Sequence, residues 1–446
     1  MTAQQPTTPR IVHASEHPIS KRMIDDDALW VLRKLNNAGF SGYLVGGGVR
    51  DLYIGKRPKD FDISTNARPG QVRKLFPNSR TIGRRFRLVQ VFFKKGSVIE
   101  ISTLRSLSEH DLDGPEAVLA PNNTFGTVDE DALRRDLTIN GLFYDIESET
   151  IIDYVGGIDD LEHRVIRVIG DPHKRINRDP IRMMRVIRHS ARSGFAIEPQ
   201  SWQAVLENAY KLRLCPPSRR RDELLKDIYS GVSATWFRLA VDSGIFEELF
   251  ACYHQDLYTA MPNGETCVAT LTAIFSTIDR LNNEAVETDN HRQPASFLLA
   301  VIFIPWAINR FNLLNINVKG AQLFHFSKQL REALNEELGR QLNLKRSLQQ
   351  EIAILLSHLP TIIIHNHDDV WPRWLKKKSY FPECRLLYYY LREALEKIAV
   401  PALTHPPEKR AAPGRDVSQQ KRKKMKHKGR PAFSGRKRGG VFGFKK

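Results

Sequence analysis

Cysteine is scarce in this sequence, with four in 446 residues, and no two of them form a CxxC pair. The spacing of the four therefore supports neither a zinc site nor a disulfide framework; they are Cys215, Cys252, Cys267 and Cys384. The first residues, MTAQQPTTPR, also lack the apolar segment of a signal peptide. Scattered thiols without a secretory signal are typical of a reducing compartment, so we expect a cytoplasmic protein.

Long apolar runs are absent as well. The longest, Ala295 to Ile308, is too short to cross a bilayer and contains Pro305, so it predicts a buried helix and no stable membrane insertion. The sequence has no repeat of fixed period and no Ser, Cys or His in an evident nucleophile setting. With 41% apolar and 26% charged residues, the composition is that of a globular protein. The length predicts two or three domains.

Positive charge is abundant and unevenly distributed. The formal net charge is +18, and the segment from Pro406 to Lys446 alone contains 15 Lys or Arg against 2 Asp or Glu. This segment has no hydrophobic periodicity, which predicts a disordered arm that binds a polyanion. Its densest basic run supplies the candidate RNA-binding residues Lys421, Arg422, Lys423 and Lys424.

The most informative stretch runs from Leu44 to Ser64 and reads LVGGGVRDLYIGKRPKDFDIS. A short apolar approach leads into Gly46 and Gly47, and Arg50 follows within one helical turn. Glycine-rich turns of this kind let backbone amides approach a phosphate group closely. The turn and its arginine therefore predict a phosphate-binding element.

Two aspartates of the same stretch, Asp60 and Asp62, lie one residue apart in a run that is typical of a strand. Side chains at i and i+2 of a strand point to one face, so both carboxylates project together while Phe61 and Ile63 face a core. Like charges this close repel each other, and hard oxygen ligands suit Mg²⁺. The combination of glycines, arginine and paired acids predicts a phosphate-and-metal site. The alternative is a glycine-rich turn followed by two solvated acids.

A further carboxylate is offered by the predicted strand Val98 to Thr103. Glu100 alternates there with Ile99 and Ile101, so its carboxylate faces away from the apolar side. If the two strands are neighbours, Glu100 completes a three-carboxylate metal site. The equally weighted alternative is a surface glutamate on a half-buried strand.

The chain turns largely helical from Arg178 onward. In RDPIRMMRVIR, Arg182, Arg185 and Arg188 recur at i, i+3 and i+6 and form one basic stripe on a helix that Asp179 precedes. The stripe is either a solvated face or a contact for the nucleotide. Residues 371–380, WPRWLKKKSY, mix aromatic rings with cations, which suits nucleic-acid stacking and equally suits core tryptophans beside a solvated lysine run.

Five motifs occur in one order between Tyr43 and Arg188: LVGGGVRD, KDFDIS, RRDLTIN, DYVGGIDDL and RDPIRMMRVIR. Together they resemble the head and neck of the bacterial tRNA nucleotidyltransferase/poly(A) polymerase family, a branch of the DNA polymerase beta-like nucleotidyltransferases. The resemblance continues in SRRRDELLKDIYSG, from Ser218 to Gly231.

The resemblance implies roles for the motif residues. Two Mg²⁺ ions would be bound by Asp60 and Asp62. For the third carboxylate, strand alternation favours Glu100, and the motif context allows Asp136. The residues it implies for nucleotide binding are Gly46, Gly47 and Arg50 at the triphosphate, Arg134 with Asp136 at the pocket edge, Asp179 and Arg182 at the base edge, and Arg185. The sequence departs from the family at Arg178, where the family usually has Glu.

Two activities share this family, CCA addition to tRNA and untemplated poly(A) addition. The segment Ile82 to Val91 resembles the poly(A) branch, with Thr81 replacing the usual aliphatic residue, and so do Gly48 and the basic tail. We therefore predict a polynucleotide adenylyltransferase that adds AMP from ATP to RNA 3′ ends in mRNA processing and decay, with RNA-decay proteins as partners. The alternatives are a CCA-adding enzyme and a non-catalytic RNA-binding adaptor.

The predicted fold class is α+β, with a small mixed-sheet nucleotidyltransferase head, an all-helical neck and body, and a disordered basic tail. The predicted boundaries are 1–17 for a disordered N-terminus, 18–150 for the head, 151–217 for the neck, 218–400 for the RNA-binding body and 401–446 for the tail. Within the head, Asp25 to Asp27 and Gly39 are the start and stop signals of a first helix.

Overall fold

The computed structural model describes residues 8–83, 87–94, 96–106, 125–262, 264–288 and 292–397. All of them belong to one compact unit, Met1–Ala402. The predicted RNA-binding residues Lys421 to Lys424 and the rest of the basic tail lie outside the described residues. Part of the segment Ile82 to Val91 lies outside them too.

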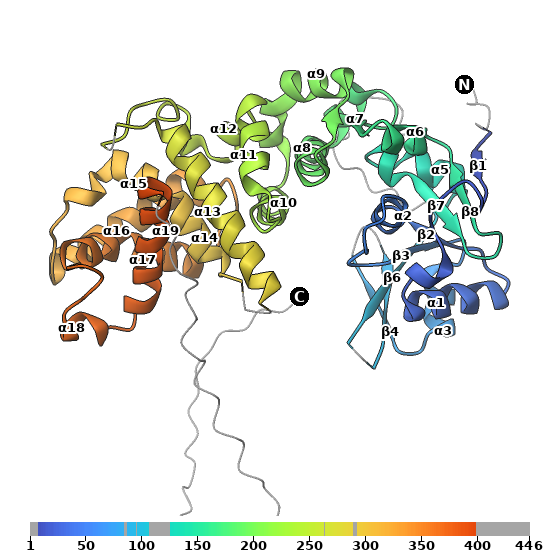
Figure 1. The fold of residues 1–446 in the computed structure, drawn as a ribbon, viewed down its shortest axis with the longest axis horizontal. Helices are drawn as coiled ribbons and strands as arrows, with labels where there is room; N and C mark the ends of the chain where they lie inside the picture. Colours follow the sequence, from blue (N-terminus) through green and yellow to red (C-terminus); the bar gives the residue numbers. More distant parts are fainter. Residues whose placement is uncertain are drawn as a thin grey trace, which may run out of the picture. The chain divides into compact units, whose positions relative to one another are not determined.

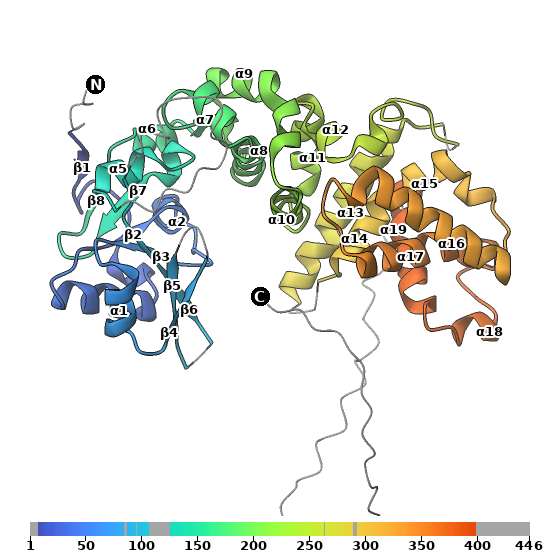
Figure 2. The same cartoon turned by 180° about the vertical axis from the view of Figure 1, so that it is seen from behind.

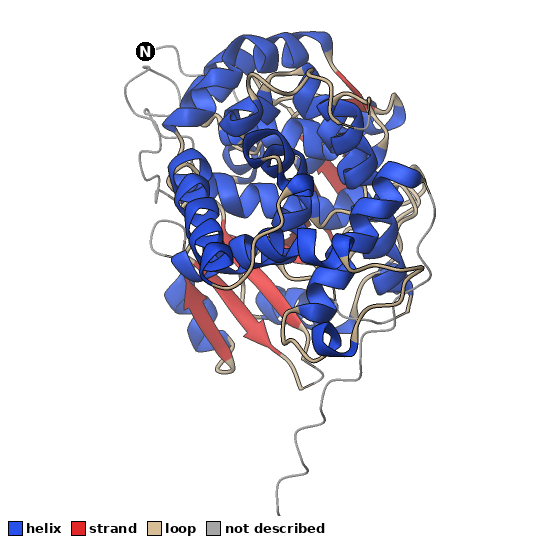
Figure 3. Ribbon diagram, turned by 90° about the vertical axis from the view of Figure 1, so that its left-hand side faces the viewer, coloured by secondary structure: helices blue, strands red, loops and turns tan. Residues whose placement is uncertain are grey.

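The head is built on an eight-stranded mixed sheet, whose strands are seen in Figures 1 and 3. Its order is β1-β8-β7-β2-β3-β6-β5-β4. Of the neighbouring strands in this order, β3 and β6 are parallel, and all the remaining pairs are antiparallel. The strands are β1 (Arg10–Val12), β2 (Gly42–Val45), β3 (Asp62–Thr65), β4 (Ser79–Ile82), β5 (Leu88–Phe92), β6 (Val98–Thr103), β7 (Leu142–Asp145) and β8 (Thr150–Asp153).

The first helix, α1 (Asp26–Asn37), begins and ends where its sequence signals predict. The carboxylate of Asp25 accepts a hydrogen bond from the amide of Asp27 at 2.8 Å, and Gly39 follows the helix with φ +79°. Helix α1 contacts β2, β3 and β6, and α3 contacts β4, β5 and β6 (Figure 1). The other head elements are η1 (Lys21–Met23), α2 (Gly47–Tyr53), α3 (Pro69–Leu75), α5 (Val128–Leu133), η2 (Thr138–Asn140) and α6 (Gly157–Glu162).

Three points of the predicted domain organisation need correction. Within the predicted disordered segment 1–17, residues 10–12 form β1, which pairs antiparallel with β8 and buries the side chain of Val12. Strand β8 also carries the head sheet past residue 150. The neck is not all helical, since β9 (Val165–Ile166) pairs with β10 (Ala196–Ile197). These strands are two to four residues long, too short for periodicity to register, and their pairing partners lie far away in the sequence.

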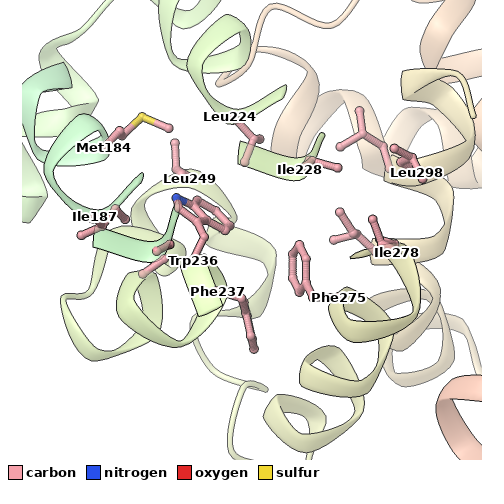
Figure 4. Packing of buried hydrophobic residues seen from close by; sticks show 14 of the residues in the cluster. Met184, Ile187, Leu224, Ile228, Trp236, Phe237, Leu249, Phe275, Ile278 and Leu298 are labelled. Atoms are coloured by element: carbon pink, nitrogen blue, oxygen red, sulfur yellow. The ribbon is translucent and has the colours of Figure 1, made fainter. Parts of the chain in front are cut away.

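The rest of the described chain is helical, and its core is continuous with that of the head. Figure 4 shows side chains of α8, α10, α11, α12, α13 and α14 meeting in this core, where Phe237 stacks on Phe275 at 4.7 Å between ring centroids. The helices are α7 (Pro172–Arg178), α8 (Ile181–Ser193), α9 (Pro199–Asn208), η3 (Ala209–Leu214), α10 (Pro217–Ile228), α11 (Ser233–Asp242), α12 (Ile245–Leu249), η4 (Ala251–Tyr253), α13 (Cys267–Glu287), α14 (Ala295–Ile302), α15 (Ile304–Phe311), η5 (Leu313–Asn315), α16 (Ala321–Leu334), the π-helix η6 (Asn335–Gly339), α17 (Arg346–Ile364), α18 (Arg373–Lys376) and α19 (Phe381–Glu396).

The apolar run Ala295 to Ile308 is buried, as predicted, and is divided between α14 and α15. Among the described helices, only α17 is long and apolar enough to cross a membrane, and half of that window is buried. Helix α17 contacts α14, α16 and α19 (Figure 2), and core helices of soluble proteins pass the same test of length and composition.

Candidate active site

The glycine turn connects β2 to α2. Gly46 has φ +65° and ψ −127°, and its amide donates a hydrogen bond to the carbonyl of Leu142 at 3.2 Å. A Cβ at this position would lie 3.1 Å from Nη1 of Arg135. Gly46 is therefore required both by its backbone conformation and by the closeness of Arg135. At Gly48 a Cβ would meet nothing nearer than 3.6 Å, so this glycine is not required by packing.

This difference gives a matched pair of variants. Gly46→Ala is expected to lower the free energy of unfolding by about 1–2 kcal/mol, since an L-residue is strained in this conformation. Gly48→Ala should leave it unchanged or raise it by up to about 1 kcal/mol, because alanine is the better helix former. Denaturant unfolding of both proteins checks this, and equal losses at the two positions would contradict it.

The paired aspartates lie at the start of β3. Asp62 is the first residue of the strand and Asp60 precedes it; both are exposed, whereas Phe61 and Ile63 are buried. The predicted alternation is therefore confirmed. In the register of the sheet, Asp62 pairs with Val45, the residue that precedes the glycine turn. Pairing with β2 thus brings the carboxylates next to the turn.

Glu100 lies beside Asp62, because the parallel pairing of β3 with β6 sets the two residues opposite each other. The neighbouring strand β5 sets Gln90 opposite Glu100, and its Nε2 donates a hydrogen bond to Oε1 of Glu100 at 2.9 Å. Asp62, Glu100 and Gln90 therefore form a row across three strands. The sequence interpretation missed Gln90, although its place on the polar face of β5 was a usable signal.

The pKa of Asp62 is raised to about 6. The residue as a whole is exposed, but the atoms packed around its carboxylate remove part of the water there, which is the largest cause; the negative charge of Glu100 is the second. Asp60 adds to this rise, and Arg135 opposes it. The site therefore contains negative charge that its own residues do not balance. A bound cation would balance it.

This charge and the all-oxygen donors fit a divalent cation such as Mg²⁺. Across the part of the chain that the structure describes, however, no three His, Cys, Asp or Glu side chains converge as a ready metal cluster. The two observations agree if the phosphates of a nucleotide supply the remaining ligands, as is usual for Mg²⁺. Asp60, Asp62 and Glu100 are the residues that would hold the ion.

Arg50 is held from three sides. Its guanidinium donates to Oδ1 of Asp51 at 2.7 and 2.9 Å and to Oδ1 of Asn140 at 2.6 Å, and Nδ1 of His189 lies 3.4 Å away. Burial, followed by the positive charge of Arg50, lowers the pKa of His189 to about 3, so this imidazole is neutral at physiological pH. The sequence interpretation did not single out Asn140 or His189.

A pocket of about 380 Å³ joins these parts. It contains acidic residues of the metal site together with the arginine of the turn and further cations from the head and from α8. Its lining includes Gly47, Gly48, Arg50, Asp51, Lys56, Lys59, Asp60, Asp62, His189 and Arg192. Such a pocket can hold a metal-bound polyphosphate, with the carboxylates on the metal and the cations on the phosphate oxygens.

Asp136 lies elsewhere, against helix α8. Its carboxylate forms ion pairs with Arg182, at 2.7 Å, and with Arg185. Burial alone would raise its pKa, but these two arginines hold the pKa below its ordinary value. Of the two candidates for the third carboxylate, it is therefore Glu100 that adjoins Asp62. Arg134 instead binds Asp131 at 2.9 Å.

The predicted base-reading pair is engaged with other residues. Both carboxylate oxygens of Asp179, which ends α7, accept hydrogen bonds from Arg219 of α10 at 2.7 and 2.9 Å. Arg182 donates to the backbone carbonyls of Arg134 and Arg135 as well as binding Asp136. The sequence interpretation missed Arg219, which belongs to the motif SRRRDELLKDIYSG.

The arginine stripe of α8 is not a solvated face. Arg185 binds Asp136 and Glu223, and the buried Arg188 binds Glu223 and Asp227 of α10. The stripe therefore connects the head to the body through ion pairs. Its direct contact with a nucleotide remains a prediction for Arg182 and Arg185.

Comparison with known proteins gives two family matches. Residues 42–167 match the family described as the poly A polymerase head domain. Residues 194–257 match one described as the probable RNA and SrmB-binding site of polymerase A. The resemblance inferred from the motifs is thus confirmed, and the matched head contains the glycine turn, Asp60, Asp62 and Glu100.

Curated relatives include both kinds of enzyme. The chain is 43% identical over 247 residues to Poly(A) polymerase I of Escherichia coli O6:H1, which covers 54% of this chain and 53% of that protein. It is 37% identical over 223 residues to a CCA-adding enzyme of Lactobacillus helveticus, covering 50% of this chain and 54% of that protein. The chain therefore spans about half the length of these relatives.

A solved structure of a CCA-adding enzyme in an apo form resembles this one with a TM-score of 0.55 at 20% identity. The match covers 84% of this chain and 82% of that chain. At this identity the likeness concerns the fold, and it confirms the predicted α+β class with a mixed-sheet head and a helical body.

Proposed function

We propose, from the membership of residues 42–167 in the poly(A) polymerase head family, that this chain adds AMP from ATP to RNA 3′ ends without a template. The observation that carries the proposal is the pairing of Asp62 with Glu100 on adjacent strands. Asp60 and Asp62 also line one pocket with Arg50 and with Gly47 of the glycine turn. Paired acids next to a cationic polyphosphate pocket are what nucleotidyl transfer requires.

In this proposal the RNA 3′-oxygen attacks the α-phosphorus of ATP, the new P–O bond forms, and the bond to pyrophosphate breaks. Two Mg²⁺ ions on Asp60 and Asp62, with Glu100 as a further ligand, would lower the pKa of the RNA 3′-hydroxyl and neutralise pyrophosphate. Arg50, fixed by Asp51 and Asn140, binds triphosphate oxygens near Gly46 and Gly47. Gln90 keeps the carboxylate of Glu100 in place.

Base selection is assigned to the neck. Asp179 and Arg182 offer an acceptor and a donor to the base edge, and Arg185 and Arg134 line the approach to them. Because Asp179 binds Arg219 and Arg182 binds Asp136, these contacts set the direction of both side chains before the nucleotide arrives. Arg219 and Asp136 are therefore positioning residues, and the residue at 178 is an arginine where an acid is usual in the family.

The roles of the regions follow. The head carries out the chemistry, and the neck contains the base-reading pair. The body and the basic tail bind RNA. We assign the protein to the cytoplasm and to mRNA processing and decay, with RNA-decay proteins as partners.

A CCA-adding enzyme is the second candidate, favoured by the 37% identity to the Lactobacillus helveticus enzyme. The experiment offers the purified protein a generic RNA primer and a tRNA lacking its CCA end, with ATP or CTP alone and together. Long tails from ATP alone on the generic primer support poly(A) addition. Strict addition of C, C and A to the tRNA would overturn it. No addition to either RNA would leave an RNA-binding adaptor.

The basic tail leads to a prediction about salt. Deleting residues 406–446, which contain 15 Lys or Arg, is expected to raise the apparent KM for RNA and leave turnover at saturating RNA unchanged. The slope of log affinity against log salt should become shallower by roughly 0.7 for each lost phosphate contact. Filter binding at several salt concentrations measures the slope. An unchanged slope would contradict an RNA-binding role for the tail.

A further inference from the structure

The two tryptophans of residues 371–380 have different environments. Trp371 is buried, its indole N–H donates to the carbonyl of Ile362 at 2.9 Å, and its ring packs edge-on against Phe381 and two tyrosines of α19. Trp374, in α18, is 49% exposed (Figure 1 shows α18). The first ring is core, as one alternative predicted, but the second is available at the surface.

In the sequence, Trp374 is flanked by more positive than negative charge. Arg373, Lys376, Lys377 and Lys378 are all exposed, and none of them forms an ion pair with a described residue. The nearby Asp369 is already paired with Arg392 at 3.0 Å. Four cations without ion-pair partners next to an exposed indole leave a surface that attracts a polyanion.

The position of Trp374 is also fixed. The ring of His365 lies edge-on to it at 5.2 Å between centroids, and the neighbouring Leu375 is fully buried and anchors the short helix. A ring held in this way loses little conformational freedom when another ring stacks on it.

We propose that the surface formed by Arg373, Trp374, Lys376, Lys377 and Lys378, called here the Trp374 surface, binds single-stranded RNA. A base stacks on Trp374, and the four cations contact the phosphates on either side of it. Rings interleaved with cations are the usual platform for unpaired nucleic acid. A protein partner is disfavoured, because lysine is depleted from the cores of protein interfaces.

The Trp374 surface is a different site from the catalytic pocket, since none of its residues lines that pocket. It also lies outside both matched regions, 42–167 and 194–257. That the bound RNA is the substrate rests on the proposed function. The binding itself does not, so it is tested without any reaction.

The direct test is tryptophan fluorescence of the full chain with a single-stranded RNA of about 20 nucleotides, longer than the roughly 4–16 that one binding module covers. Stacking of a base on Trp374 should quench part of the emission. The quenching should vanish in Trp374→Phe, which removes the reporter but keeps a ring. Equal quenching in wild type and Trp374→Phe would overturn the proposal.

Affinity for the same RNA provides the second readout. Trp374→Ala should weaken binding roughly fivefold to a hundredfold, the range for one base–aromatic stack, whereas Trp374→Phe should retain most of the affinity. Replacing Lys376, Lys377 and Lys378 by alanine should make the salt slope shallower by about 2. Phe324→Ala, at a ring that is 68% exposed on α16, is the control and should bind like wild type. Wild-type affinity in Trp374→Ala would overturn the proposal.

These outcomes are independent of catalysis. A protein that transfers no AMP but shows the Trp374-dependent quenching would retain the RNA surface and lose the proposed function. An active enzyme whose RNA affinity is unaffected by Trp374→Ala would retain the proposed function and contradict the RNA-binding role of the Trp374 surface.

Discussion

Asp62→Asn is expected to abolish AMP addition while keeping the fold. The neutral amide cannot replace a carboxylate ligand, and losing several kcal/mol of transition-state stabilisation lowers the rate by roughly a thousandfold. Thermal unfolding should show no loss of stability without divalent cations, because the substitution removes a charge that Glu100 and Asp60 repel. Primer extension and a melting curve of the same preparation measure both effects.

The pH dependence of stability follows from the raised pKa of Asp62, about 6. The folded state holds this proton more tightly than the unfolded chain does, so the group stabilises the fold at low pH. That contribution is lost as the pH rises through about 6. Asp62→Asn should therefore unfold with a smaller decrease in Tm between pH 5 and pH 7 than wild type.

Mg²⁺ provides a readout that does not depend on activity. In the presence of ATP, whose phosphates supply the remaining ligands, it should raise the Tm of the wild-type protein and have a smaller effect on Asp62→Asn, because a ligand that binds the folded state stabilises it. The same Mg²⁺ response in both proteins, or normal AMP addition by the variant, would contradict the assignment of Asp62.

Arg188→Met is expected to produce the largest loss of stability. Arg188 is buried and binds Glu223 and Asp227. Its removal leaves the buried Asp227 without its cation, whereas Glu223 keeps Arg185 and Lys226. Removing one partner of a buried ion pair lowers the free energy of unfolding by about 3–5 kcal/mol. Urea denaturation monitored by circular dichroism measures the change.

Two further variants separate this mechanism from a general effect of losing arginine. Arg238→Met, at an exposed position of α11 with no ion pair among the described residues, should change stability by no more than about 0.5 kcal/mol. Adding Asp227→Asn to Arg188→Met should restore part of the loss, because one unpaired charge disappears. A loss in Arg188→Met below about 1 kcal/mol would contradict a structural role for the cluster.

Local patterns in the sequence were sufficient for the catalytic side of the head. Helix α1 has its cap residues in order, and the alternation around Asp60 and Asp62 gives the two exposed acids and two buried apolar residues that the structure contains. Each of these features depends on neighbours within a few residues, so periodicity and capping rules apply to it directly. The same holds for the glycine at 46.

Contacts between distant segments could not be predicted in this way. Periodicity indicated that Glu100 faces away from the core, but only the parallel pairing of β3 and β6 sets it beside Asp62 and leaves Asp136 to the arginines of α8. For the arginine stripe, helical spacing placed the side chains on one face. Which element covers that face depends on the packing of α10.

What the sequence by itself determined is therefore the nature of the site: a glycine turn, an arginine and paired acids, in motifs that resemble those of the nucleotidyltransferase family. The tertiary structure decided which charges meet. In the folded chain Arg188 forms ion pairs with the acids of α10, and Gln90 donates a hydrogen bond to Glu100. Strand β1 pairs with the head sheet, and Trp371 is buried whereas Trp374 is exposed. The physical reason is that strand and helix periods fix the direction of a side chain, whereas its partner depends on long-range packing.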